Sequence, residues 1–148
     1  MPTKPALFIV VDDDAINNML CKFSIRKHFG SIPIVTFLEA QKALDVIRIE
    51  YDNPIPRPTV LFLDIAMPGM NGWNFLDVFG RFNDTIRKQF TIYILSSSVQ
   101  QSDENKALAH PLVSGYIRKP LLESSLENIL GGLASGNGKP GPAPSFLF

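Results

Sequence analysis

The sequence has little cysteine and no excess of charge of either sign. Its only cysteine is Cys21, so no disulfide can form within the chain. Fourteen basic side chains balance fourteen acidic ones, and the basic residues form no cluster. Because nucleic-acid-binding modules normally present a basic face, DNA and RNA are not expected partners.

Long hydrophobic runs and zinc ligands are also scarce. No charged start is followed by a long apolar stretch, so neither export nor membrane insertion is indicated, and we expect a cytoplasmic protein. One cysteine and two histidines do not make a zinc site. The chain instead has 45% hydrophobic and 19% charged residues over 148 positions, which is typical of one globular domain with its own core.

Five short apolar runs, bounded by turn residues, recur along the chain. Each is rich in Val, Ile, Leu or Phe, as buried parallel strands usually are. The runs are Ala6–Val11, Pro33–Phe37, Val60–Leu63, Thr91–Leu95 and Gly115–Ile117. They predict five strands.

Segments with helical spacing lie between and after these runs. The first follows Asp14, a predicted N-cap. Its apolar stripe consists of Ile16, Met19, Leu20 and Phe23. Similar stripes occur within residues 40–47, 75–82 and 122–133, whereas residues 103–109 form a polar, weakly patterned helix. Apart from that one, each helix has an apolar face, as a helix that covers a sheet should. The alternation predicts an α/β fold with helices on both faces of a parallel sheet.

Two stretches interrupt this alternation. Residues 50–59 contain three prolines, so we expect a stiff loop at the amino ends of the strands, remote from the ligand edge. Residues 134–148 are rich in Gly and Pro and have no periodic pattern. We therefore expect one domain over residues 1–133 and an unstructured tail over residues 134–148.

Acidic side chains follow the first and third predicted strands. Asp12 and Asp13 end the first strand, and Asp64 ends the third. Ligands of open α/β sheets bind at the carboxyl ends of the strands. Two carboxylates a few Å apart repel each other by about 4 kcal/mol at an effective dielectric near 20, so a cation is expected among them. A few hard oxygen ligands favour Mg²⁺.

The ends of the fourth and fifth predicted strands bring a hydroxyl group and a cation. The fourth strand is followed by Ser96, Ser97 and Ser98, and the fifth leads to Lys119 and Pro120. Acidic metal ligands, a carboxylate nucleophile, a hydroxyl and a lysine are the groups that phosphoryl transfer requires. The sequence therefore predicts phosphoryl-transfer chemistry at this edge.

Four motifs in this order resemble the response-regulator receiver domain of two-component signalling. They are Val10–Asp13, Leu63–Gly72, Ser96 and Gly115–Pro120. The resemblance extends from about Ala6 to Leu133 and implies a flavodoxin-like fold, with a five-stranded parallel sheet in the order 2-1-3-4-5. It also implies a single-domain signalling protein that is not an enzyme in the usual sense, although it takes part in its own phosphorylation and dephosphorylation.

The resemblance implies roles for the acidic residues. Asp64 is the expected phosphoacceptor, which takes a phosphoryl group from a phosphohistidine of a sensor kinase or histidine phosphotransfer protein. Mg²⁺ is expected to bind Asp13, Asp64 and the carbonyl oxygen of Ala66 directly, and Asp12 through water.

The remaining matched residues form the expected phosphoryl-binding and switch group. Lys119 contacts the phosphoryl oxygens, and the peptide bond before Pro120 is cis. Ser96 turns its hydroxyl to the phosphoryl group, Ser97 is the small residue that leaves access open, and Tyr116 turns into the vacated space. The polar helix over residues 103–109 and the edge that carries Tyr116 form the predicted signalling face for a downstream protein. Phosphorylation-dependent dimerisation stays open.

Three other functions compete with this one. A phosphohydrolase of the haloacid dehalogenase type needs an acidic residue two positions after its nucleophile, where Ala66 stands. A receiver-like protein that works without phosphate has no need of the full set of acidic, hydroxyl and lysine residues. A flavin-binding relative needs a phosphate-cradling loop after the first strand, and the acidic run from Asp12 to Asp14 would repel phosphate.

Overall fold

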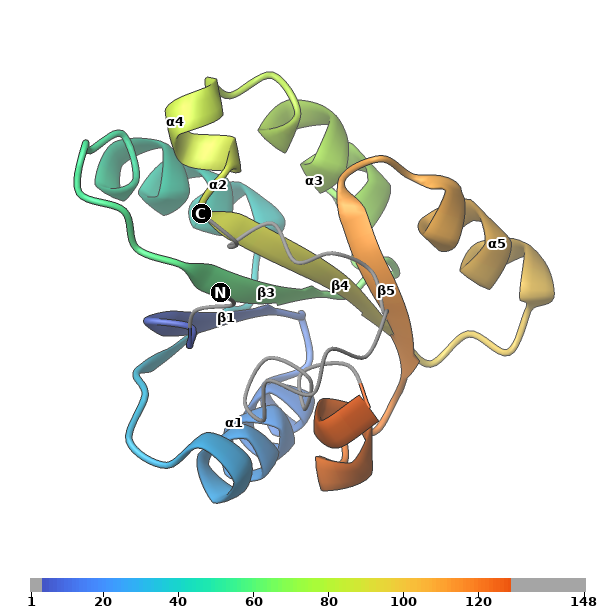
Figure 1. Ribbon diagram of the computed structural model, residues 1–148. Coiled ribbons are helices and arrows are strands. Elements are labelled where there is room, and N and C mark those ends of the chain that lie inside the picture. The colour runs from blue at the N-terminus through green and yellow to red at the C-terminus, as the bar shows by residue number, and fades with distance from the viewer. Residues whose placement is uncertain (1–3, 129–148) are drawn as a thin grey trace.

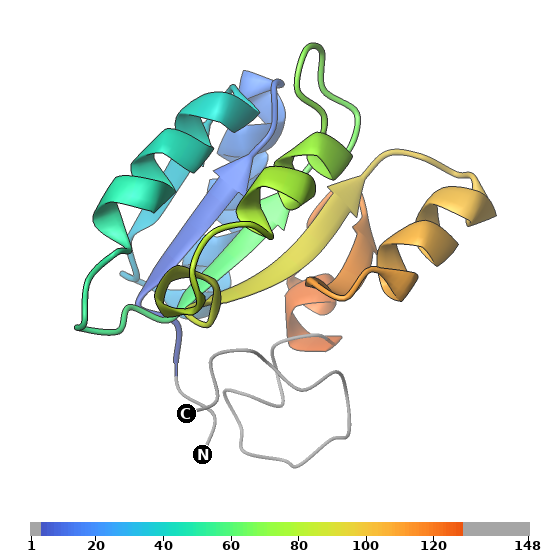
Figure 2. The ribbon, with the colours of Figure 1, turned by 90° about the horizontal axis from the view of Figure 1, so that it is seen from above.

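The computed structural model describes residues 4–128, which form a five-stranded parallel sheet with the predicted strand order β2-β1-β3-β4-β5. The strands are β1 (Leu7–Val11), β2 (Ile34–Phe37), β3 (Thr59–Leu63), β4 (Phe90–Ser96) and β5 (Val113–Arg118). Figure 2 shows that neighbouring strands run in the same direction, so their carboxyl ends lie on one edge of the sheet.

Helices cover both faces of this sheet (Figure 1). On one face lie α2 (Ala40–Glu50), α3 (Gly72–Phe79) and α5 (Gln101–Ala109). On the other lie α1 (Ala15–Phe29) and helical residues 123–128. None of the described helices is long and apolar enough to span a membrane. The end of the last predicted helix and the predicted tail over residues 134–148 lie outside the described residues.

The connections between helices and strands agree in part with those predicted from the sequence. Residues 51–58 form neither helix nor strand, which confirms the predicted proline-containing loop. The third predicted helix is shorter than its apolar stripe, because α3 ends at Phe79 and Phe82 packs against the core from the following loop. The short helix α4 (Asp84–Arg87), which the sequence did not predict, follows this loop.

Strands β1, β3 and β4 are buried along their whole length, and their side chains alternate between two apolar clusters. Leu7, Ile9 and Val11 belong to the cluster under α2 and α3. Phe8 and Val10 belong to the cluster under α1. The fully buried central strands explain why the sequence shows continuous apolar runs rather than polar alternation.

Helix α1 buries a different face from the one predicted. Asp14 caps it as expected, because its carboxylate accepts hydrogen bonds from the backbone N–H groups of Ile16 (2.9 Å) and Asn17 (3.3 Å). The predicted apolar stripe is nevertheless exposed, by 65% at Ile16, 61% at Met19, 51% at Leu20 and 66% at Phe23. The buried residues are instead Asn17, Asn18, Cys21 and Ile25. The prediction failed because the first half of α1 lies against polar strand ends, where amides find hydrogen-bonding partners.

Candidate functional site

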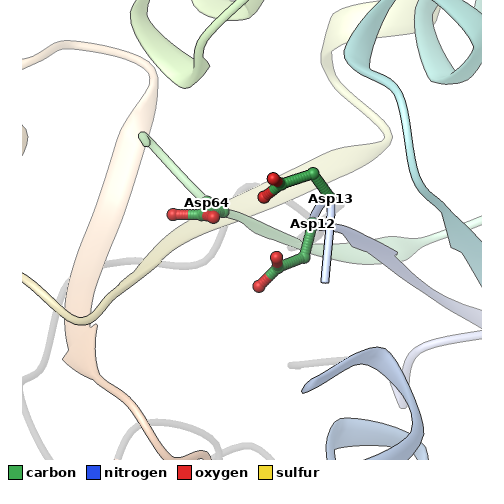
Figure 3. A group of neighbouring side chains, drawn as sticks. All are labelled: Asp12, Asp13 and Asp64. Carbon is green, nitrogen blue, oxygen red and sulfur yellow. The ribbon is translucent and has the colours of Figure 1, made fainter. Parts of the chain in front are cut away.

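Three carboxylates meet where β1 and β3 end (Figure 3). Asp12 and Asp13 follow β1, Asp64 follows β3, and one oxygen from each lies within 4.8 Å of the others. Because Val11 and Leu63 are paired at the ends of adjacent parallel strands, the residues after them must lie side by side. Asp12 and Asp64 are buried, with 1% and 4% exposure, whereas Asp13 is exposed.

The loop after β3 holds Asp64 in place. The backbone N–H of Ala66 donates a hydrogen bond to Asp64 Oδ1 (3.0 Å). Gly72, which begins α3, packs directly on this loop, since a Cβ there would lie 2.7 Å from the carbonyl oxygen of Asp64. The Leu63–Gly72 motif is therefore a backbone arrangement that fixes the orientation of Asp64.

Lys119, which follows β5, reaches two of the three carboxylates. Its Nζ atom lies 2.6 Å from Asp12 Oδ2 and 3.4 Å from Asp64 Oδ2. Its backbone N–H donates to the carbonyl oxygen of Ser96 (2.8 Å), and the Lys119–Pro120 peptide bond is cis. The lysine thus connects the ends of β1, β3 and β5.

Burial and charge shift the pKa values of this group. Burial raises the pKa of Asp64, and repulsion from Asp12 raises it further, while the N–H of Ala66 and the ammonium of Lys119 offset these effects only in part. For Lys119, burial alone would lower the pKa, but the hydrogen bond to Asp12 and the charge of Asp64 raise it overall. One ammonium does not balance three carboxylates, so the described group has an excess of negative charge.

Two asparagines of α1 support Asp12, and sequence reasoning missed both. Asn17 Nδ2 donates to Asp12 Oδ2 (2.7 Å). Asn18 Nδ2 donates to the carbonyl oxygens of Asp12 (3.0 Å) and Phe37 (3.4 Å), which links the ends of β1 and β2. The available signal was the pair of adjacent amides that interrupts the apolar stripe of α1, shortly after the acidic run from Asp12 to Asp14.

The other predicted switch residues lie at the ends of β4 and β5. Ser96 is the buried last residue of β4, and its Oγ accepts a hydrogen bond from the backbone N–H of Ser98 (3.0 Å). Ser97 is exposed. Tyr116 is half-buried, and its hydroxyl donates to the carbonyl oxygen of Ser98 (3.3 Å). Of the predicted phosphoryl-binding residues, Lys119 alone contacts the carboxylates among the described residues.

The chemistry of these donors fits Mg²⁺. Three carboxylate oxygens in a small group suit a hard divalent cation, and the group contains no cysteine or histidine. Asp13 makes no described hydrogen bond or ion pair through its carboxylate, so both of its oxygens are available to an ion.

Known proteins have the same fold. Residues 8–130 match the family model of the response regulator receiver domain. A response regulator receiver protein from Dyadobacter fermentans is 29% identical, with a TM-score of 0.75 over 86% of this chain and 97% of that one. A two-component response regulator from Cytophaga hutchinsonii is 27% identical, with a TM-score of 0.77 over 90% and 99%. The phosphorylated cyanobacterial phytochrome response regulator RcpA is 21% identical, with a TM-score of 0.65 over 89% and 93%. No curated protein matches the chain.

The family match identifies a receiver module of two-component signalling, and the strand order and the acidic group at the carboxyl edge agree with it. The chain belongs to the response regulator receiver domain family. The resemblance found in the sequence motifs is thereby confirmed.

Proposed function

We propose that this chain is a phosphorylation-gated signalling module in which Asp64 accepts a phosphoryl group. The observation that carries the proposal is the meeting of Asp64 with two further carboxylates and with Lys119. The donor is a phosphohistidine of a sensor kinase or histidine phosphotransfer protein. An oxygen of Asp64 forms a bond to phosphorus while the P–N bond breaks, and the electron pair leaves with the imidazole, which takes up a proton. The product is an acyl phosphate.

The neighbouring residues prepare Asp64 for this reaction. Asp12, Asp13, Asp64 and the carbonyl oxygen of Ala66 hold Mg²⁺, which when bound neutralises charge on the transferred phosphoryl group. Lys119 adds a second positive charge beside Asp64. The N–H of Ala66 keeps the Asp64 carboxylate in one orientation.

The switch connects the phosphoryl group to α5. In the proposal, the Ser96 hydroxyl binds a phosphoryl oxygen, and Ser97 leaves room for it. Two hydrogen bonds link the residues after β4 to β5 and α5. Tyr116 donates to the carbonyl oxygen of Ser98, and Ser98 Oγ donates to Asp103 on α5 (2.5 Å). A shift at the end of β4 therefore changes the α5 surface that a downstream protein contacts.

The exposed apolar stripe of α1 is the proposed docking surface for the phosphodonor protein. Exposed apolar side chains grouped on one helix face often mark a protein–protein contact. The stripe begins at Ile16, three residues after Asp13, and continues along the helix through Met19, Leu20 and Phe23. A partner bound there would hold its phosphohistidine near Asp64.

Incubation with acetyl phosphate and Mg²⁺, followed by intact mass measurement, tests this function. We expect the chain to gain one phosphoryl group that hydroxylamine removes, because acyl phosphates react with this nucleophile. Asp64→Ala should gain none, while the matched variant Asp77→Ala, which removes an exposed carboxylate of α3, should behave like the wild type. An unchanged mass for the wild type, or a gain that survives Asp64→Ala, contradicts the proposal.

A further inference from the structure

We propose that Asn17 restricts Asp12 to one free lone pair and thereby makes the carboxylate site select Mg²⁺ over Ca²⁺. The inference rests on the proposed Mg²⁺ site and deepens it. Asn17 lies on α1 and would be a positioning residue, because its described side-chain contacts are with Asp12 and Cys21 and it does not belong to the three-carboxylate group.

The hydrogen bonds of Asp12 leave little of its carboxylate available. An ionised carboxylate has about four lone-pair positions. Oδ1 accepts the backbone N–H of Asp14 (2.9 Å), and Oδ2 accepts both Asn17 Nδ2 (2.7 Å) and Lys119 Nζ (2.6 Å). Three positions are therefore occupied and about one remains. Asp12 can offer a single lone pair to an ion or to its bound water, and cannot bind an ion through both oxygens.

Of the two donors on Oδ2, Asn17 is the more buried. Its side chain is buried, and Nδ2 also lies 3.6 Å from the Sγ atom of Cys21. That thiol is neutral, because burial raises the pKa of Cys21 to about 12. Lys119, by contrast, is shared with Asp64. In the unphosphorylated protein, with Lys119 on Oδ2, Asn17 therefore fills the second lone pair of that oxygen.

This restriction discriminates between the two common divalent ions. Mg²⁺ requires six ligands in near-octahedral geometry and usually keeps several waters, so carboxylates that bind through one oxygen suit it. Ca²⁺ takes six to eight oxygens and often binds a carboxylate through both. Holding Asp12 to one lone pair removes a ligand that Ca²⁺ could use and keeps the one that Mg²⁺ needs.

Calorimetric titration of the unphosphorylated protein with Mg²⁺ and, separately, with Ca²⁺ tests this inference. Asn17→Leu keeps the size of the side chain and removes the donor. We expect Mg²⁺ to bind about tenfold more weakly, as is typical when the hydrogen-bonding partner of a metal ligand is lost. Ca²⁺ affinity should hold or rise, because a second lone pair of Asp12 becomes free. The ratio of the two dissociation constants is the decisive quantity.

Asn18→Leu is the matched control. Asn18 is the next residue and is also buried, but its amide donates to backbone carbonyl oxygens rather than to the carboxylate. Both variants should melt at a lower temperature, and Asn17→Leu alone should shift the Mg²⁺/Ca²⁺ ratio. If Asn17→Leu does not fold, Asn17→Ala serves in its place.

The outcomes separate this inference from the function on which it rests. An unchanged ratio in the Asn17 variant, or an equal shift in both variants, overturns the role of Asn17 while leaving the metal site intact. A wild-type protein that binds no Mg²⁺ overturns the metal site and this inference together.

Discussion

Neutral polar groups surround the amino end of β3, and charged groups surround its carboxyl end. At the amino end, neutral groups satisfy one another: the Tyr51 hydroxyl is hydrogen-bonded to Thr59 Oγ1 (2.7 Å), and the Gln89 side chain accepts from the N–H of Arg57 (2.8 Å) and donates to the carbonyl oxygen of Tyr51 (3.0 Å). At the carboxyl end, three carboxylates meet, and the ammonium of Lys119 contacts two of them, those of Asp12 and Asp64. One end of the strand therefore contributes stability, while the other holds a charge imbalance that a ligand must relieve.

Removing the ammonium of Lys119, which among residues 4–128 is the one that contacts the carboxylates at this end, should have the largest effect. Lys119→Met leaves Asp12 and Asp64 buried without their counter-charge, and we expect the free energy of unfolding at neutral pH to fall by about 3 kcal/mol. Urea denaturation without divalent ions measures this. Addition of Mg²⁺ should recover part of the loss, because the ion replaces the missing positive charge.

Lys42→Met is the control for this experiment. Lys42 on α2 forms an exposed ion pair with Glu39, the residue before the helix (3.1 Å), and such pairs contribute about 0.5 kcal/mol or less. If the two lysine variants lose equal free energy of unfolding, Lys119 does not stabilise the protein by offsetting the negative charge at the strand ends.

A substitution at the amino end of β3 should lower stability without affecting phosphoryl incorporation. Gln89→Ala removes the partners of the Arg57 N–H and of the Tyr51 carbonyl oxygen, and we expect it to lower the free energy of unfolding by about 2 kcal/mol. Phosphoryl incorporation by the folded protein should be unchanged, since the network lies at the opposite end of the strand. A folded Gln89→Ala that no longer gains a phosphoryl group would show that the two ends are coupled.

The sequence predicted the charged end well because its signal is local. Each acidic residue directly follows a buried apolar run, and in a parallel sheet the ends of such runs lie on one edge. The strand order and the meeting of Asp12, Asp13 and Asp64 follow from this rule together with the motif resemblance.

The neutral end and the buried face of α1 could not be read in the same way. Gln89 and Tyr51 are 38 residues apart, and nothing in local spacing connects a glutamine to a distant carbonyl oxygen. On α1, the spacing rule treats apolar residues as buried, so it chose Ile16 and its neighbours over Asn17 and Asn18. The rule fails where a helix packs on charged groups, because burial there follows hydrogen bonding rather than hydrophobicity.

The smallest predicted effect is a gain in stability from neutralising Asp64. The folded protein raises the pKa of this carboxyl above its ordinary value of 3.8, mainly through burial, so the folded state holds the proton more tightly than the unfolded state. The contribution of Asp64 to stability therefore falls as pH rises from about that value through the folded pKa, and stays low above it. Asp64→Asn has no such loss.

Without divalent ions at neutral pH, Asp64→Asn should therefore be more stable than the wild type by about 1 kcal/mol, and the difference should vanish in acid, where the wild-type carboxyl is protonated. Mg²⁺ should reduce or reverse this difference in stability. An ion that binds the folded protein stabilises it by mass action, and it binds the Asp64 carboxylate of the wild type more tightly than the amide of the variant. Thermal unfolding across pH, with and without Mg²⁺, measures both trends. A variant that is less stable than the wild type at neutral pH would mean that the strand end is already electrostatically satisfied, and that its contrast with the amino end does not exist.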